Sequence, residues 1–285
     1  LLTHLFVLIP VLDNSKHYWV GADEVEKLLD KGKGWLEDHP HKDFIARRYL
    51  KHRRGLTRWA LEQLNDDILD DDADIPKQTE EAIEKPIRLN DQRMDIVSTT
   101  LRELGAQTVV DLGCGEGKLI SHLMNEPSFR RILGVDVSPI ALKRAHKNLD
   151  VDRLTPRQQG RLELVQGSLI YVDPRLDGFD AAACIEVIEH MEPDRLGAFE
   201  QVVFATAKPK HVIISTPNNE YNVLFENLKP GKMRHNDHRF EWTRAEFQEW
   251  AEGVAERNGY NVKFSSIGDE HDLHGAPTQM GVFSR

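Results

Sequence analysis

The sequence predicts an α/β fold, in which helices cover both faces of a mostly parallel β-sheet. From about residue 86 onwards, short apolar runs alternate with segments of helical periodicity, and this alternation is typical of strand–helix–strand units. A glycine-rich loop follows the first apolar run, and acidic or small polar residues follow the next two. Polar residues at successive strand ends indicate a ligand site at the carboxyl edge of a parallel sheet.

The composition is that of an ordinary globular protein, with 285 residues, 40% hydrophobic and 29% charged, and a net charge of −10. Such a charge argues against broad, non-specific nucleic-acid binding, but not against recognition of a strand end at a local basic site. Cys114 and Cys184 cannot form a disulfide framework, so we expect a reducing, cytoplasmic setting. No apolar run reaches the roughly 18 residues of a membrane span, and we expect no membrane partner.

Three regions are expected along the chain. Residues 1–64 are predicted to form a strand and helices that belong to a truncated upstream domain, because the chain opens inside an apolar stretch without a Met. Residues 65–85 are rich in Asp, and like charges with little to bury predict an acidic linker. Residues 86–285 are predicted to form the main domain.

The N-terminal region is predicted to contain a strand at 5–13 and helices at 21–32 and 43–64. The second helix is strongly basic, with Arg47, Arg48, Lys51, Arg53, Arg54 and Arg58. A solvated helix face explains this charge as well as a contact for nucleic acid or an acidic partner does, and both interpretations stay open.

In the main domain, a helix is expected at 90–105, ahead of the sheet. The expected strands are, in order, 108–113, 131–137, 162–168, 179–185 and 211–217, with 261–269 and 279–285 as a closing pair. The helices between them are predicted to begin near Gly117, Ser138, Glu186 and Thr243.

The glycine loop after the first strand contains Gly113, Gly115 and Gly117, which allow a ligand to approach the backbone closely. Their G-x-G-x-G spacing differs from the dinucleotide spacing G-x-G-x-x-G, and no Lys-Ser/Thr pair of a P-loop follows. Asp111, at the end of the strand, offers a carboxylate that suits an amine-bearing ligand better than a pyrophosphate.

The next two strands end in further polar groups. Asp136, which Val137 follows, can accept hydrogen bonds from both hydroxyls of a ribose, and Gly167 and Ser168 could border an adenine. Together with the loop, this pattern resembles the S-adenosylmethionine site of class I methyltransferases, which implies a Rossmann-like, mostly parallel sheet of seven strands. A NAD-type Rossmann enzyme is the alternative, and the missing dinucleotide spacing is its main weakness.

Glu186, Glu189 and His190 follow the fourth strand. In a helix that begins at Glu186 they would occupy positions i, i+3 and i+4 on one face. Acidic residues are also favoured in a first helical turn, so a solvated helix start is the alternative. His235 and His238, in a loop after the fifth strand, can reach the same edge. Carboxylates and imidazoles together suit Mn²⁺, Mg²⁺, Fe²⁺ or Zn²⁺.

The motif E-x-x-E-H at 186–190, followed by R-H-x-D-H-x-F-E-W-T-R at 234–244, resembles the RNA 3′-terminal 2′-O-methyltransferases. This family has a plant small-RNA branch and a bacterial RNA-repair branch, and residues 8–29 are similar to the bacterial branch in particular. The resemblance implies transfer of a methyl group from S-adenosylmethionine to the 2′-OH of the 3′-terminal ribose of RNA. In this family Asp111, Asp136 and Ser168 would match the methyl-donor positions.

The resemblance also implies one divalent metal, Mn²⁺ or Mg²⁺, held by Glu186, Glu189, His190 and one distant histidine. We prefer His238 as the distant ligand because it fits the family pattern best. His235 is the alternative, and we expect it nearer the reacting hydroxyl, where it could accept the proton.

The implied substrate is a single-stranded RNA 3′ end. The residues proposed to hold it are Arg88, Arg93, Lys232, Arg234, Arg239 and Arg244, with Tyr221, Phe225, Phe240 and Trp242 for stacking. For Phe240 and Trp242 we favour core packing. In the bacterial branch the protein assembles with a polynucleotide kinase-phosphatase that also carries a ligase module. The alternatives are a metal-independent small-molecule methyltransferase and a scaffold module of an RNA-repair complex.

Overall fold

The computed structural model describes residues 4, 7–8, 22–37, 39–49, 88–226, 228–229, 231–235 and 237–285. The chain divides into two compact units, residues 1–75 and 76–285, and each is described by itself. The expected acidic linker at 65–85 lies outside the described residues.

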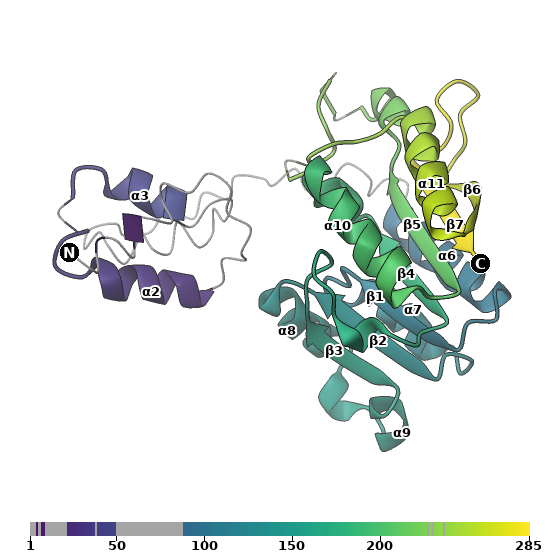
Figure 1. Cartoon of the computed structure of the whole chain (residues 1–285), viewed down its shortest axis with the longest axis horizontal. Helices are drawn as coiled ribbons and strands as arrows, with labels where there is room; N and C mark the ends of the chain where they lie inside the picture. Colours follow the sequence, from purple (N-terminus) through teal and green to yellow (C-terminus); the bar gives the residue numbers. More distant parts are fainter. Residues whose placement is uncertain are drawn as a thin grey trace. The chain divides into compact units, whose positions relative to one another are not determined.

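The first unit contains the helices α2 (Ala22–Gly32) and α3 (Lys42–Tyr49) (Figure 1). Its small core consists of Val7, Leu28, Leu36, Ile45, Ala46 and Tyr49. Both helices were expected, although the rest of the basic helix lies outside the described residues. The strand expected at 5–13 is wrong where it can be checked, because Val7 and Leu8 are helical.

The second unit is built on a seven-stranded sheet with the order β3-β2-β1-β4-β5-β7-β6. The strands are β1 (Thr108–Leu112), β2 (Arg131–Asp136), β3 (Leu162–Gln166), β4 (Ala181–Ile185), β5 (His211–Pro217), β6 (Asn261–Ile267) and β7 (Thr278–Ser284). Strands β1 to β5 pair in parallel, and β7 lies antiparallel between β5 and β6. All seven expected strands and the mostly parallel sheet are confirmed.

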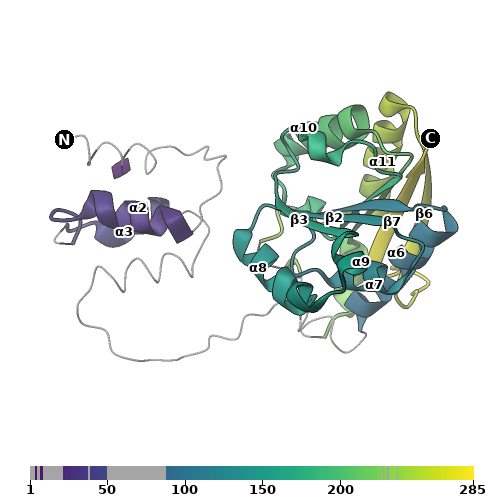
Figure 2. The same cartoon turned by 90° about the horizontal axis from the view of Figure 1, so that it is seen from below.

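Helices cover both faces of this sheet (Figure 2). They are α6 (Leu89–Glu103), α7 (Lys118–Asn125), α8 (Pro139–Asn148), α9 (Pro156–Gln159), α10 (Leu196–Glu200), which continues as a π-helix over Gln201–Ala207, and α11 (Arg244–Asn258). Side chains of α6, α7 and α8 pack in one core, and those of α10 and α11 pack in another. Strand β1 serves both, because Val109 joins the first core and Val110 the second. Among the described residues, no helix combines the length and apolarity that crossing a membrane requires.

Three of the four expected helix starts are confirmed. Gly117 precedes α7 with φ +83°, Ser138 Oγ accepts a hydrogen bond from the Ala141 N–H, and Thr243 begins α11 with a capping box to Glu246. The helix expected near Glu186 is wrong, because only a 3-10 turn, η4 (Ile188–His190), follows β4.

Two backbone features keep a longer helix from forming there. Glu186 has φ +55°, which is outside the right-handed helical region. Glu192 precedes Pro193 and is extended, as residues before proline tend to be. One turn is all that fits between them, so the side chains from Glu186 to His190 do not share a helical face.

Candidate active site

A cavity of about 400 Å³ lies at the carboxyl edge of the sheet. Its walls come from α6, the glycine loop, the start of α7, the end of β4 and the two loops that carry histidines. The lining residues are Asn90, Met94, Asp111, Gly113, Cys114, Gly115, Glu116, Lys118, Leu119, Ile185, His190 and His235. One cavity therefore joins the predicted methyl-donor loop to the predicted metal-binding segments.

The glycine loop takes a conformation that few other residues would tolerate. Gly113 has φ +80°, and a Cβ atom added to it would lie 2.6 Å from Cγ2 of Val187. Gly115 has φ +53°, and a Cβ atom there would meet no atom within 4 Å, so its backbone faces open space. The Asp136 carboxylate holds the loop by accepting hydrogen bonds from the N–H groups of Gly115 (2.8 Å) and Ser138 (2.7 Å).

Asp111 is buried at the floor of this cavity, with 3% of its surface exposed. Burial and the neighbouring charge of Asp136 raise the pKa of the Asp111 carboxyl to about 7. Burial also raises the pKa of the Cys114 thiol, with help from the same two carboxylates. A cationic ligand group beside Asp111 would favour its ionised form.

The other predicted methyl-donor residues lie at the ends of β2 and β3. Val137 accepts a hydrogen bond from Gln166 Nε2 (3.1 Å) through its carbonyl, and the Gly167 N–H donates to the Asp136 carbonyl (3.0 Å). A Cβ atom on Gly167 would lie 2.7 Å from Cγ1 of Val135, so a larger residue would not fit. Gly117 lies between the lining residues Glu116 and Lys118, but Asp136, Val137, Gly167 and Ser168 are not among the residues that line the cavity.

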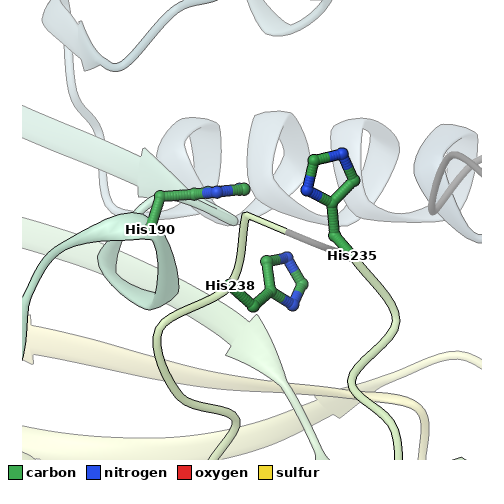
Figure 3. A group of neighbouring side chains, drawn as sticks. All are labelled: His190, His235 and His238. Atoms are coloured by element: carbon green, nitrogen blue, oxygen red, sulfur yellow. The ribbon is translucent and has the colours of Figure 1, made fainter. Parts of the chain in front are cut away.

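Three histidines gather beside the cavity (Figure 3). His190 comes from η4, and His235 and His238 come from the loop that leads to α11. Each offers a ring nitrogen within 4.8 Å of the others. The ring centroids are 4.7 Å apart for His190 and His238, and 5.6 Å for His190 and His235. The sequence predicted that these loops would meet, and the structure brings all three rings together.

The partners of the rings differ. Nδ1 of His238 lies 2.5 Å from Oε1 of Glu241, and its buried Nε2 has no hydrogen-bond partner in the described part of the chain. Nδ1 of His235 accepts a hydrogen bond from the Asp237 N–H (3.0 Å), and Nδ1 of His190 lies 3.8 Å from Oδ2 of Asp237. Burial and the charges of His190 and His238 lower the pKa of His235.

The two glutamates have other neighbours. Glu186 accepts a hydrogen bond from Ser215 Oγ (2.7 Å), and its Oε2 lies 2.9 Å from Nη2 of the buried Arg93. Glu189 is fully buried and accepts a hydrogen bond from Thr216 Oγ1 (3.1 Å). Within the described residues, neither carboxylate joins the group formed by the three histidines.

Most of the cations predicted to hold RNA have partners in the protein. Arg93 and Arg234 are buried, Arg239 lies 3.0 Å from Glu192, and Arg244 lies 2.6 Å from Glu220. Phe240 and Trp242 stack with a centroid distance of 4.3 Å and pack against the core, as expected. Tyr221 and Phe225 contact each other in and just after η7 (Asn219–Leu224). Of the remaining candidates, Arg88 lies at the start of α6 and Lys232 precedes the histidine loop.

Glu241 is a site residue that the sequence analysis missed. It stands between Phe240 and Trp242 in the sequence, and its side chain is buried. The side chain contacts His238, Asn222 and Arg234. Burial would raise the pKa of Glu241, but hydrogen bonds from His238 and Asn222 and the charge of Arg234 outweigh it and lower the pKa. In an extended segment, successive side chains point to opposite sides, so an acidic residue between two aromatic residues points away from both of them. This pattern was the signal available in the sequence.

Comparison with known families agrees with this architecture. Residues 1–65 match the family described as the RNA repair, ligase-Pnkp-associating, region of Hen1, and residues 72–262 match the methyltransferase domain family. The small RNA 2′-O-methyltransferase of Arabidopsis thaliana is 37% identical over 73% of this chain and 24% of its own length. The chain spans about a quarter to about half of the curated relatives that it matches.

Solved structures point the same way. The methyltransferase domain of a bacterial Hen1 is 52% identical, covers 69% of this chain and 100% of its own, and superposes with a TM-score of 0.64. A chain of the Pnkp1/Rnl/Hen1 RNA repair complex is 25% identical, with 69% of this chain and 42% of its own covered and a TM-score of 0.50. With the glycine loop and the seven-stranded sheet already described, these matches show that the chain belongs to the Hen1 methyltransferase family, whose curated relatives are named small RNA 2′-O-methyltransferases.

Proposed function

We propose that this protein transfers a methyl group from S-adenosylmethionine to the 2′-OH of the 3′-terminal ribose of RNA, and that the reaction requires a divalent metal. The observation that carries the proposal is the shared cavity of about 400 Å³. Asp111, Gly113 and Gly115 line it together with His190 and His235, so a methyl donor on the glycine loop would lie beside the histidine cluster.

The residues of the donor half fit S-adenosylmethionine. The buried carboxyl of Asp111 suits the ammonium of a methionyl group, and the open face of Gly115 lets a ligand approach the backbone. Asp136 lies at the end of β2, where a carboxylate can accept hydrogen bonds from ribose hydroxyls. When bound, S-adenosylmethionine supplies a methyl group activated by its sulfonium charge, and the cavity walls align that group with the acceptor.

The residues of the other half fit a divalent cation. Nε2 of His238 is buried without a hydrogen-bond partner among the described residues, and ring nitrogens of His190 and His235 are within 4.8 Å of a His238 nitrogen. We propose His190 and His238 as ligands. Glu189 and Glu186 would complete the set that the family pattern implies only if they turned from Thr216 and from Ser215 and Arg93 toward the histidines. Nitrogen ligands suit Mn²⁺ better than Mg²⁺, which prefers oxygen, so we rank Mn²⁺ first.

His238 is a better candidate for the distant ligand than His235. The Asp237 N–H already donates to Nδ1 of His235, so a neutral His235 ring carries its proton on Nε2. His238 has the opposite arrangement, because its Nδ1 faces the Glu241 carboxylate. We therefore place His235, which lines the cavity, next to the reacting hydroxyl, where its Nε2–H can donate a hydrogen bond to the oxygen. To accept the proton of that hydroxyl, as a base would, the ring would first have to release the Asp237 N–H from Nδ1.

If the proposed ligands held a divalent metal, it would supply Lewis-acid chemistry that lowers the pKa of the 2′-OH of a ribose with both hydroxyls free. An internal nucleotide has its 3′ oxygen in a phosphodiester, so the proposal predicts reaction at the 3′-terminal ribose only. The product would be an RNA end marked by methylation, as expected for repaired or small RNAs.

The test uses the full chain, radiolabelled S-adenosylmethionine and a short single-stranded RNA, with EDTA, Mg²⁺ or Mn²⁺. We expect label on the terminal ribose only with metal, and none on RNAs that end in a 2′-deoxy or 3′-deoxy nucleotide. His238→Asn and Glu189→Ala should abolish labelling. Glu200→Gln should not, because the partners of Glu200 are Arg257 and Asn258 at the end of α11, and none of the three lines the cavity.

Other results would favour the alternatives. Labelling of RNA that persists in EDTA would remove the metal from the mechanism and return the glutamates to a structural role. Absence of label on every RNA, in a protein that binds S-adenosylmethionine, would favour a small-molecule methyltransferase.

We also propose that residues 1–65 bind a polynucleotide kinase-phosphatase that carries a ligase module. Support comes from the match of this segment to the ligase-Pnkp-associating region and from the similarity to a chain of an RNA repair complex. Co-purification of the partner with the full chain, but not with residues 76–285 alone, is the expected result. Equal co-purification with both would contradict the assignment to this segment.

A further inference from the structure

We propose that Glu241 is a positioning residue, which Arg234 and Asn222 hold in place so that it fixes the tautomer of His238. In this tautomer Nδ1 carries the proton and Nε2 presents its lone pair toward His190 and His235. The consequence for metal affinity rests on the proposed function, but the tautomer itself does not.

The hydrogen bonds around Glu241 define it as an acceptor. Its Oε1 accepts from the Arg234 N–H (2.6 Å), and its Oε2 accepts from Asn222 Nδ2 (2.5 Å). Both partners can only donate, and the side chain is buried beside a guanidinium, so the carboxyl is ionised. Nδ1 of His238, 2.5 Å from Oε1, must therefore be the donor in their hydrogen bond.

Arg234 fixes this arrangement from behind. Its Nε donates to Asn222 Oδ1 (2.7 Å), which turns the amide so that Nδ2 faces Glu241. Its Nη2 donates to the carbonyls of Asn218 and Pro277, at 2.7 Å each. With 1% of its surface exposed, Arg234 cannot contact RNA as the sequence analysis proposed, and it serves the histidine loop instead.

The free end of the His238 ring then has a defined character. Nε2 is buried and has no hydrogen-bond partner in the described part of the chain. A proton there would place an N–H among imidazole rings without an acceptor, which is costly in a buried site. A lone pair there can bind a metal, and carboxylates behind metal-binding histidines commonly set this tautomer.

Glu241→Gln tests the proposal in the full chain, because glutamine has the same shape but must turn either a donor or a neutral acceptor toward its three partners. In metal-free protein with ¹⁵N-labelled histidine, we expect the parent to show His238 protonated at Nδ1 and the variant to lose this preference. The His238 signal is assigned by its loss in His238→Asn. Titration with Mn²⁺ should show about 10- to 100-fold weaker binding in the variant.

Glu200→Gln is the matched control. Glu200 also accepts hydrogen bonds from an arginine and an asparagine, Arg257 (2.9 Å) and Asn258 (2.8 Å), but within the described part of the chain no histidine hydrogen-bonds to it. We expect the His238 tautomer and Mn²⁺ affinity to be those of the parent. Glu241→Asp keeps the charge, so it should keep the tautomer and lose less affinity than Glu241→Gln, and it provides the measurement if the glutamine variant does not fold.

The outcomes separate the two proposals. An unchanged His238 tautomer in Glu241→Gln, or equal losses of affinity in the Asp and Gln variants, would overturn the positioning role even if the parent methylates RNA. A parent that neither binds Mn²⁺ nor methylates RNA would overturn the proposed function, while the tautomer measurement would still decide the role of Glu241.

Discussion

At the scale of single residues, Asp111 shows how a ligand site costs stability. Burial, with the charge of Asp136, raises the pKa of its carboxyl from 3.8 to about 7. Below pH 3.8 the group is protonated in both the folded and the unfolded chain, and it costs nothing. As the pH rises, the unfolded chain loses the proton first, so the free energy of unfolding falls until the pH passes about 7. The full cost is about 4 kcal/mol.

Asp111→Asn should remove this pH-dependent cost, because the amide is neutral at every pH. We expect the variant to have a higher free energy of unfolding than the parent at both pH values. The difference between the two proteins should be about 2 kcal/mol larger at pH 8 than at pH 5.5. Urea unfolding at the two pH values measures the difference. With S-adenosylhomocysteine added at pH 8, the parent should become the more stable of the two proteins, since the ammonium of this ligand can pair with the carboxylate of the parent only. A pH-independent difference between the proteins would contradict the raised pKa.

Glu186 is a second residue that belongs to the proposed site and is also expected to contribute to the stability of the fold. Its Oε2 lies 2.9 Å from Nη2 of Arg93, and both side chains are largely buried. Glu186→Gln removes one charge of this pair, so we expect a loss of about 3 kcal/mol in the free energy of unfolding. Glu220→Gln, which breaks the more exposed pair with Arg244, should cost less than about 1 kcal/mol. Equal, small losses in both variants would mean that Glu186 does not stabilise the fold through Arg93.

At the scale of elements, the strands could be predicted because buried parallel strands are short, continuous apolar runs. Strand β4 is an example, with four of its five residues buried over Ala181–Ile185. Helix starts could be predicted where a local cap defines them, as Ser138 and Thr243 do. These signals lie within a few residues of the element that they define, so a single sequence is enough to predict the element from them.

The segment after β4 shows where such local reasoning failed. The spacing of Glu186, Glu189 and His190 fits a helix, but Pro193 was also visible and limits the turn to η4. The result redirects the side chains, because Glu186 turns to Arg93 and Ser215 while His190 reaches the other histidines. The i, i+3, i+4 spacing therefore pointed to residues near the cavity, but the shared helical face that it predicted for them is wrong.

The convergence of the histidine segments was predictable from topology, since β4 and β5 are neighbours and their carboxyl ends meet. The network behind His238 was not. Arg234 contacts Asn218 and Pro277, which lie 16 and 43 residues away in the sequence. No periodicity or cap connects such positions, and a basic residue near an RNA site has the same sequence signature whether it binds RNA or lies buried.

At the scale of the whole molecule, each unit has a core of its own. All described residues of the small core with Leu28 and Leu36 lie in residues 1–75, and both cores of the sheet lie in residues 76–285. Separate cores are what independently folding domains require. The match to a bacterial methyltransferase domain also covers only 69% of this chain, while that domain is covered completely.

We therefore expect residues 76–285 to fold alone and to methylate RNA at a rate within about twofold of the full chain, because every residue of the cavity and of the histidine network lies in this unit. The measurement compares the urea midpoint of the fragment with that of the corresponding transition in the full chain, and then the metal-dependent labelling of both. The Asp111→Asn fragment serves as the inactive control. A fragment that folds with the same midpoint but labels RNA much more slowly would mean that residues 1–75 contribute to substrate binding, and the basic segment from Arg47 to Arg58 would then be the first region to examine.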